Sequence, residues 1–180
     1  KRPKTYNSWL SFASISLTDV DSINGRCILK HPGQTYPLFS ADSIDSDSYD
    51  ASLYPIEFLN SLSVPGLPPH VLNLKIGAPI ILLRTIDIHS GLCNGTRLIV
   101  ENIQPHCITS KIITGPGKNN IALIPRINLT PSNTRLPFTF SRRQFPVKLA
   151  YAMTINKSQG QSLTKVGIYL PQCVFSHGQL

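Results

Sequence analysis

The sequence predicts a mixed α/β fold that is interrupted by a small β insert at about residues 85–140. Three observations favour this class. Near the C-terminal end, a strand, a short helix and a second strand are expected in that order, which is typical of a parallel sheet. Short strands separated by turn residues fill the middle of the chain. Fifteen prolines argue against a helical bundle, while 41% hydrophobic and 14% charged residues indicate a folded chain.

The first predicted helix follows residues 1–17, which give no clear structural signal. In "TDVDSINGRCILK", Thr18 is expected to cap this helix, because its hydroxyl can accept a hydrogen bond from a free backbone N–H of the first turn. One face of the helix is apolar. We expect that face to be buried, and it consists of Val20, Ile23, Cys27 and Ile28.

A strand and a second helix are expected next. Residues 36–39 predict a short strand, and the acidic, serine-rich segment after them predicts a loop. A short helix should start after Pro55, because proline is tolerated in a first helical turn. The prolines and glycine of "VPGLPPH" should end that helix. Its buried side is expected to consist of Ile56, Leu59 and Leu62.

From residue 71 onward the sequence is rich in β-forming residues. Residues 71–87 predict two strands with a turn or bulge at Gly77, and Asn94-Gly95 precedes a further strand. A hairpin is expected around residues 115–120. Short strands at this spacing are typical of a small barrel.

The last part of the chain should return to an α/β layer. "FPVKLAYAMT" predicts a strand, "INKSQGQSL" a short helix and "KVGIYL" another strand. We therefore expect four regions: residues 1–17 of uncertain fold, residues 18–84 as the first part of an α/β domain, residues 85–140 as the insert, and residues 141–180 as the rest of the α/β domain.

Charge is distributed unevenly along the chain. Residues 1–60 hold five basic and seven acidic side chains, whereas residues 61–180 hold twelve basic and two acidic ones. This excess indicates either a polyanionic partner or a solvated basic face. The chain has no apolar stretch long enough to span a membrane, and its four scattered cysteines are typical of a reducing compartment.

Several common catalytic sites find no support in the sequence. The turn "TGPGKNN" contains Gly117-Lys118, but Ile112 and Asn119 break the pattern of a nucleotide-binding P-loop. The five histidines lack metal-ligand spacing, so no metal site is expected. No nucleophile elbow or zinc-protease helix is present.

The segment "TINKSQG" groups small polar side chains around one lysine at the predicted start of a helix. Backbone N–H groups at such a position can bind phosphate, and the side chains add donors and charge. The alternative is an N-capped helix with a solvated lysine. The residues concerned are Thr154, Asn156, Lys157, Ser158, Gln159 and Gly160.

Arg142 and Arg143 lie next to three phenylalanines in the sequence. Cations interleaved with aromatic rings suit a groove for single-stranded nucleic acid. Alternating aromatic residues in a strand are as typical of a buried core. Both interpretations stay open from the sequence, and the phenylalanines are Phe138, Phe140 and Phe145.

Four segments together resemble the C-terminal part of petite-integration-frequency-type DNA helicases, especially the copies in Helitron transposons. They are "EFLNSLSVPGLPPHVLNLKIGAPIILLRTID", "GLCNGTRLIV", "RRQFPVKLAYAMTINKSQGQSL" and "VGIYLPQCVFSHGQL". The segments "VDSIN" and "YPLFSADSID" extend the likeness to residues 19–180.

This resemblance implies a superfamily 1 helicase that uses ATP and Mg²⁺ and moves 5′ to 3′ along single-stranded DNA. Its second RecA-like domain would hold a Src-homology-3-like β-barrel insert, and its first RecA-like domain would be the partner. "TINKSQGQ" is similar to helicase motif V. By that likeness, Thr154, Asn156 and Lys157 would bind DNA, and Gln159 and Gly160 would couple to ATP. We expect Ser158, Arg142 and Arg143 to be further DNA contacts.

The departures from the family pattern concern the nucleotide site. These 180 residues contain no Walker A loop, no Walker B acidic pair and no ATP-contacting arginine after "FSHGQL". We therefore expect no catalytic residue, no bound cofactor and no ATPase activity in this chain alone. The alternatives are a non-enzymatic basic β module that binds nucleic acid and a decayed domain. The resemblance implies an intracellular, nuclear protein, and leaves open repair, recombination, telomere maintenance or transposition.

Overall fold

The computed structural model describes residues 11–14, 16–44, 54–131, 136–158 and 166–169. The chain forms two compact units. Residues 1–31 and 149–180 form the first unit, and residues 32–148 form the second. The second unit therefore interrupts the first in the sequence. Each unit is described by itself below.

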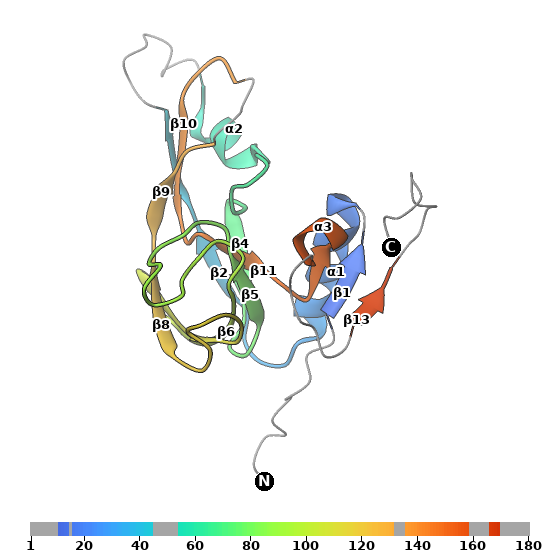
Figure 1. Cartoon of the computed structure of the whole chain (residues 1–180). Coiled ribbons are helices and arrows are strands. Elements are labelled where there is room, and N and C mark those ends of the chain that lie inside the picture. The colour runs from blue at the N-terminus through green and yellow to red at the C-terminus, as the bar shows by residue number, and fades with distance from the viewer. Residues whose placement is uncertain (1–10, 15, 45–53, 132–135, 159–165, 170–180) are drawn as a thin grey trace. The chain divides into compact units, whose positions relative to one another are not determined.

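The first unit contains a three-stranded parallel sheet with the order β12-β1-β13. Strands β1 and β13 are labelled in Figure 1. Strand β1 is Ser11–Ser14, β12 is Ala152–Thr154 and β13 is Val166–Ile168. The predicted parallel sheet is confirmed. The two predicted C-terminal strands do not pair with each other, because β1 lies between them and pairs with both. Residues 1–17 thus supply a central strand that the sequence did not reveal.

Helix α1, Leu17–Lys30, is confirmed, but its cap differs from the prediction. Ser16 is the N-cap, and its Oγ accepts a hydrogen bond from the Thr18 N–H at 3.2 Å. Thr18 itself therefore lies in the first turn. Ile23 and Cys27 are only half-buried. The fully buried side chains of α1 are Val20, Asn24 and Ile28.

The second unit begins with strands that pair over long sequence distances. Strand β2, Tyr36–Phe39, pairs with β4, Val71–Leu74. Strand β3, Ala41–Ile44, pairs with β10, Phe140–Gln144, and β10 also pairs with β9, Ile127–Leu129. The loop expected after residue 39 is therefore wrong for its first part, which continues as β3. The rest of that acidic segment lies outside the described residues.

Helix α2, Ile56–Ser61, starts after Pro55 as predicted and packs beside β10 (Figure 1). Only Leu59 of its predicted apolar side is buried, while Ile56 is 48% exposed. Leu59 belongs to a small core that α2 shares with β9 and β10. The other buried members of this core are Leu67, Leu129, Phe138 and Phe140.

A five-stranded sheet with the order β11-β5-β6-β7-β8 forms the rest of the second unit. Its strands are β5, Pro79–Leu82; β6, Arg97–Ile103; β7, Cys107–Ile112; β8, Ile121–Pro125; and β11, Val147–Leu149. The predicted hairpin is confirmed as β7 and β8. The predicted insert lies within this unit, and its Src-homology-3-like character stays a prediction.

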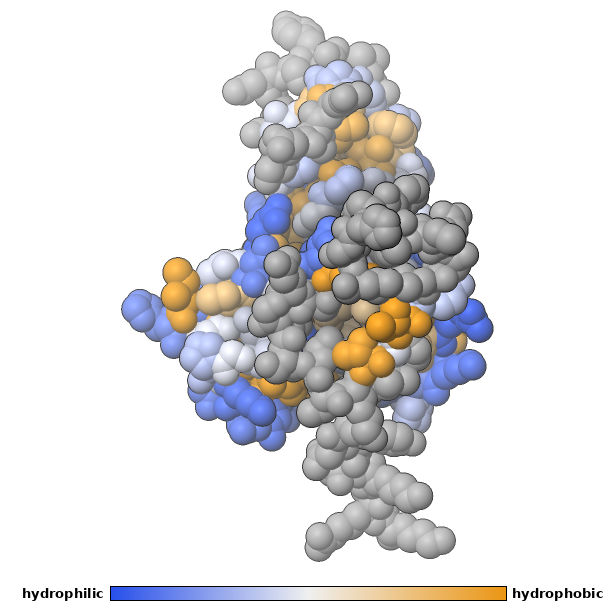
Figure 2. Space-filling model, turned by 45° about the vertical axis from the view of Figure 1, so that its right-hand side comes forward, coloured by the Kyte–Doolittle hydropathy of each residue, from blue (hydrophilic) through white to orange (hydrophobic). Residues whose placement is uncertain are grey.

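The surface of the described residues is mixed. On the face shown in Figure 2, hydrophobic side chains form separate patches between hydrophilic ones. Within the described ranges, we find no helix that is long and apolar enough to cross a membrane.

Candidate nucleic-acid interface

The predicted phosphate-binding segment lies where β12 ends and α3 begins. Thr154 is the last residue of β12, and α3, Ile155–Ser158, follows directly. Asn156 and Lys157 are exposed, and Thr154 is half-buried opposite Ser14 of β1. Ligands of α/β proteins commonly bind beyond the carboxyl ends of parallel strands. The three side chains stand at such an end.

The other predicted residues of this segment follow Lys157 in the sequence. Ser158 closes α3, while Gln159 and Gly160 lie outside the described residues. Because α3 has only four residues, it is too short for a large helix dipole. Recognition of an anion here would depend on the side chains of Thr154, Asn156 and Lys157.

A buried asparagine holds the strand that leads into this segment. Asn24 of α1 is 5% exposed. Its Nδ2 donates a hydrogen bond to the Ala152 carbonyl at 3.2 Å, and its Oδ1 accepts one from the Ala152 N–H at 2.9 Å. Asn24 thus satisfies both backbone groups of a residue two positions before Thr154. Asn24 was not predicted as a site residue, although its position as a polar residue on an otherwise apolar helix face was a signal.

Tyr151, the residue directly before β12, is also buried. Its ring lies 5.9 Å from the ring of His31, centroid to centroid. Burial is the main cause that raises the pKa of the Tyr151 phenol, and the nearby Cys27 side chain raises it further. The hydroxyl therefore stays protonated at neutral pH. It adds no negative charge beside the segment that would bind an anion.

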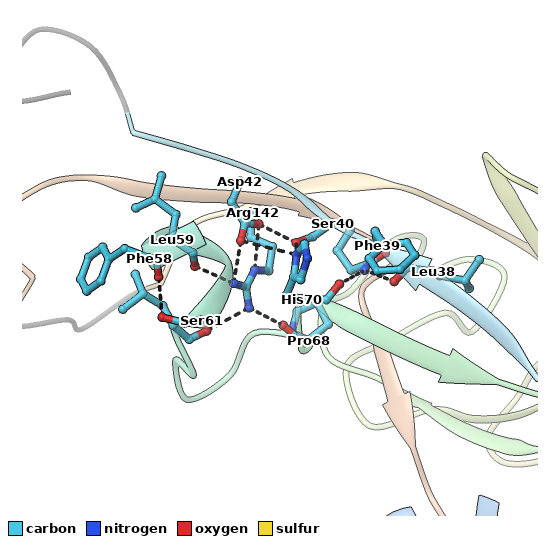
Figure 3. Close-up of polar contacts among 12 residues, drawn as sticks. Leu38, Phe39, Ser40, Asp42, Phe58, Leu59, Ser61, Pro68, His70 and Arg142 are labelled. Carbon is cyan, nitrogen blue, oxygen red and sulfur yellow. Dashed lines mark hydrogen bonds and ion pairs between the residues drawn. The ribbon is translucent and has the colours of Figure 1, made fainter. Parts of the chain in front are cut away.

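Arg142 occupies a site inside the second unit instead of on its surface. Its side chain is 1% exposed and faces Asp42 of β3 (Figure 3). Nε and Nη2 donate to the two carboxylate oxygens at 2.9 and 2.7 Å. The other three N–H groups donate to the carbonyls of Leu62, Pro68 and Leu59 at 3.1–3.2 Å.

All five guanidinium N–H groups of Arg142 are therefore used within the protein. None is left for a phosphate, so we assign Arg142 to the internal structure and not to a DNA contact. Ser40 completes the network: its Oγ donates to Asp42 Oδ1 at 2.6 Å and lies 2.8 Å from Nδ1 of His70. Asp42 was missed because its segment was interpreted as a loop.

The three phenylalanines near Arg142 are also internal. Phe138, Phe140 and Phe145 are 9%, 1% and 0% exposed. Of the two interpretations that the sequence left open, the buried core holds for these rings. Arg143 differs from its neighbour because it is exposed, and it lies opposite Ala41 and Asn128 on the outer face of β10.

The sequence is similar to those of known DNA helicases. Residues 57–103 match the family model described as "DNA helicase Pif1, 2B domain". An ATP-dependent DNA helicase PIF1 of Danio rerio is 34% identical over 167 residues, which cover 89% of this chain and 23% of that protein. This chain is a relative of the C-terminal part of Pif1-type helicases. A PIF1 of Rattus norvegicus is 31% identical over 173 residues with the same coverage.

Solved Pif1 structures share the fold. A Bacteroides Pif1 helicase in complex with ADP-AlF3 and ssDNA has a TM-score of 0.69 at 22% identity, and covers 99% of this chain and 38% of its own. A Pif1 helicase of Candida albicans has a TM-score of 0.65 at 23% identity, with 93% and 40% covered. The described part of the chain therefore shares its fold with these Pif1 helicases, which are RecA-like. The chain spans about a quarter of the length of these curated relatives.

Proposed function

We propose that this chain is part of an ATP-dependent DNA helicase and supplies part of its single-stranded DNA contact surface. The likeness to PIF1 helicases over 89% of the chain supports this proposal. The observation on which it depends is the grouping of Thr154, Asn156 and Lys157 at the carboxyl end of β12. In the complete protein, ATP with Mg²⁺ would drive movement in the 5′-to-3′ direction.

The three side chains suit a phosphate backbone for different reasons. The exposed ammonium group of Lys157 offers charge, and the hydroxyl of Thr154 and the amide of Asn156 offer hydrogen bonds. Ser158 is a further DNA contact under this proposal. Gln159 and Gly160, which follow α3, would couple this surface to the nucleotide.

Substitution of Lys157 tests the DNA contact. Lys157→Ala should weaken binding of single-stranded oligonucleotides and lower the slope of log K against log salt by about 0.7. It should not change sequence preference, because phosphate contacts position the strand without reading it. Fluorescence anisotropy over a salt series measures both quantities. Lys118→Ala, at an exposed lysine of the β7–β8 turn, is the matched control. Unchanged affinity and slope in Lys157→Ala would contradict the proposal.

ATP hydrolysis provides a second test of the proposed function. We propose that residues 18–84 and 141–180 contribute to a RecA-like motor domain, that residues 85–140 contribute an insert, and that an N-terminal RecA-like domain supplies the Walker motifs. The 180-residue chain should then show no ATP hydrolysis with or without single-stranded DNA. A phosphate-release assay measures this, and appreciable turnover would refute it.

The charge distribution favours one alternative function. Twelve basic and two acidic side chains in residues 61–180 would suit a non-enzymatic module that binds nucleic acid. The coding sequence upstream of Lys1 distinguishes the two, since a helicase requires a Walker A loop there. Under either function we propose a nuclear location, which a fluorescent fusion of the chain would test by microscopy.

A further inference from the structure

The sheet β3-β10-β9 has two faces of opposite character. The face toward α2 holds the buried Asp42–Arg142 pair and the core described above. The other face is polar and consists of small side chains around one arginine. We call it the Arg143 face, and its residues are Ala41, Ser43, Asn128, Ser141 and Arg143.

Among the described residues of β3, β9 and β10, the Arg143 face carries one positive charge and no carboxylate. Asp42 is the one acidic residue within β3, β9 and β10, and its side chain is buried on the other face. Ser43 pairs with Ser141, and Arg143 lies between Ala41 and Asn128. The neighbouring side chains are short and Arg143 is exposed, so its guanidinium is accessible from solvent, as a phosphate contact requires.

A second arginine lies close to this face. Arg126 is half-buried, and its guanidinium carbon lies 4.5 Å from the ring centroid of Phe145. Burial lowers the pKa of Arg126, and the positive charge of Arg143 lowers it further. Two guanidinium groups thus repel each other here. A bound anion would relieve that repulsion.

Arg126 also holds the backbone of an exposed aromatic residue. Its Nη1 donates to the Phe39 carbonyl at 2.6 Å and to Gln144 Oε1 at 3.0 Å. The next residue, Ser40, donates its N–H to the His70 carbonyl at 2.9 Å. Phe39 is 57% exposed, and its ring centroid lies 5.8 Å from that of His70. Phe39 is therefore an aromatic ring on a fixed backbone, which lowers the entropy cost of stacking.

We propose that the Arg143 face, with Phe39 at its edge, binds a single strand of nucleic acid, Arg143 contacting a phosphate and Phe39 stacking on a base. The combination of cation and exposed ring is the reason for this assignment. A cation alone would suit any polyanion, whereas an aromatic platform suits a strand whose bases are unpaired. This site rests on the proposed function for its ligand, but uses none of residues 154–158.

Two probes of equal length separate the two contacts. One is oligo-dT, and the other is the same sugar-phosphate chain without bases. Phe39→Ala in the 180-residue chain should weaken oligo-dT binding by about 5- to 150-fold and leave binding of the abasic strand unchanged. Arg143→Ala should weaken both and lower the salt slope by about 0.7. Fluorescence anisotropy measures each affinity.

Two further variants control for indirect effects. Phe58→Ala removes another partly exposed phenylalanine of the same unit, 41% exposed on α2, and should change neither affinity. Phe39→Leu keeps an apolar strand residue but cannot stack, so it should behave like Phe39→Ala. Equal losses on the two probes would overturn the stacking contact.

The outcomes separate this inference from the proposed function. If Lys157→Ala weakens binding while Phe39→Ala and Arg143→Ala do not, the Arg143 face is refuted and the proposed function stands. The reverse pattern supports the Arg143 face and refutes the role of Lys157. If poly-glutamate displaces oligo-dT from the chain as well as unlabelled oligo-dT does, the face binds anions in general and the nucleic-acid assignment is refuted.

Discussion

Arg142 and Arg143 are adjacent in the sequence, yet they face opposite sides of β10. Successive side chains of a strand alternate between its two faces. Arg142 therefore enters the core and pairs with Asp42, whereas Arg143 reaches solvent. Substitutions of these two neighbours therefore allow an effect on the stability of the fold to be distinguished from an effect on nucleic-acid binding.

Substitution of each arginine should affect the free energy of unfolding very differently. Arg142→Met leaves the Asp42 carboxylate buried without its partner, which should cost about 3–5 kcal/mol. Arg143→Met removes an exposed charge and should change the free energy of unfolding by no more than about 0.5 kcal/mol. Urea titration followed by circular dichroism measures both. Similar midpoints for the two variants would show that the buried pair does not stabilise the fold.

At the scale of elements, Asn24 connects α1 to β12 in the first unit. Asn24→Ala should destabilise this unit by about 1–3 kcal/mol, because the N–H and carbonyl of Ala152 would lose their partners. Hydrogen exchange at the Ala152 amide should become faster. Mass-spectrometric exchange with peptide resolution measures this.

Ser22 provides the control for Asn24. It is an exposed residue of the same helix, so Ser22→Ala should leave exchange at residue 152 unchanged. If Asn24→Ala also leaves that exchange unchanged, the side-chain bridge does not hold β12.

The elements with strong local signals could be predicted from the sequence. The Asn94-Gly95 turn, the β7–β8 hairpin and the helix after Pro55 depend on residues that are close together in the chain. Strands β1 and β3 were missed. Their sequences, "SFAS" and "ADSI", are short and poor in β-branched residues, and they become strands by pairing with segments more than 90 residues away.

The same limit applies to the candidate site. "TINKSQG" could be found because its polar residues are contiguous. The Asp42–Arg142 pair and the proximity of Phe39 to Arg126 depend on long-range contacts that no local pattern reports. The choice between groove and core for Phe138 and Phe140 depended on which face of β10 met α2.

For the molecule as a whole, the second unit is a continuous segment with its own cores. Residues 32–148 include the five-stranded sheet, whose fully buried apolar residues include Ile80, Leu82, Leu98, Ile108 and Ile124. A segment of this length can bury enough apolar surface to fold alone. We therefore expect residues 32–148 to give a dispersed NMR spectrum and a cooperative thermal transition. A spectrum typical of an unfolded chain would contradict this expectation.

The central position of β1 determines the order in which the molecule can form during synthesis. Phe12 pairs with Ala152, so β1 leaves the ribosome 140 residues before its neighbour. At about 5–20 residues per second, this takes roughly 7–28 s. All of residues 32–148 are translated in that interval and can fold first. We therefore expect β1 to be open to chaperones until its parallel neighbours are translated.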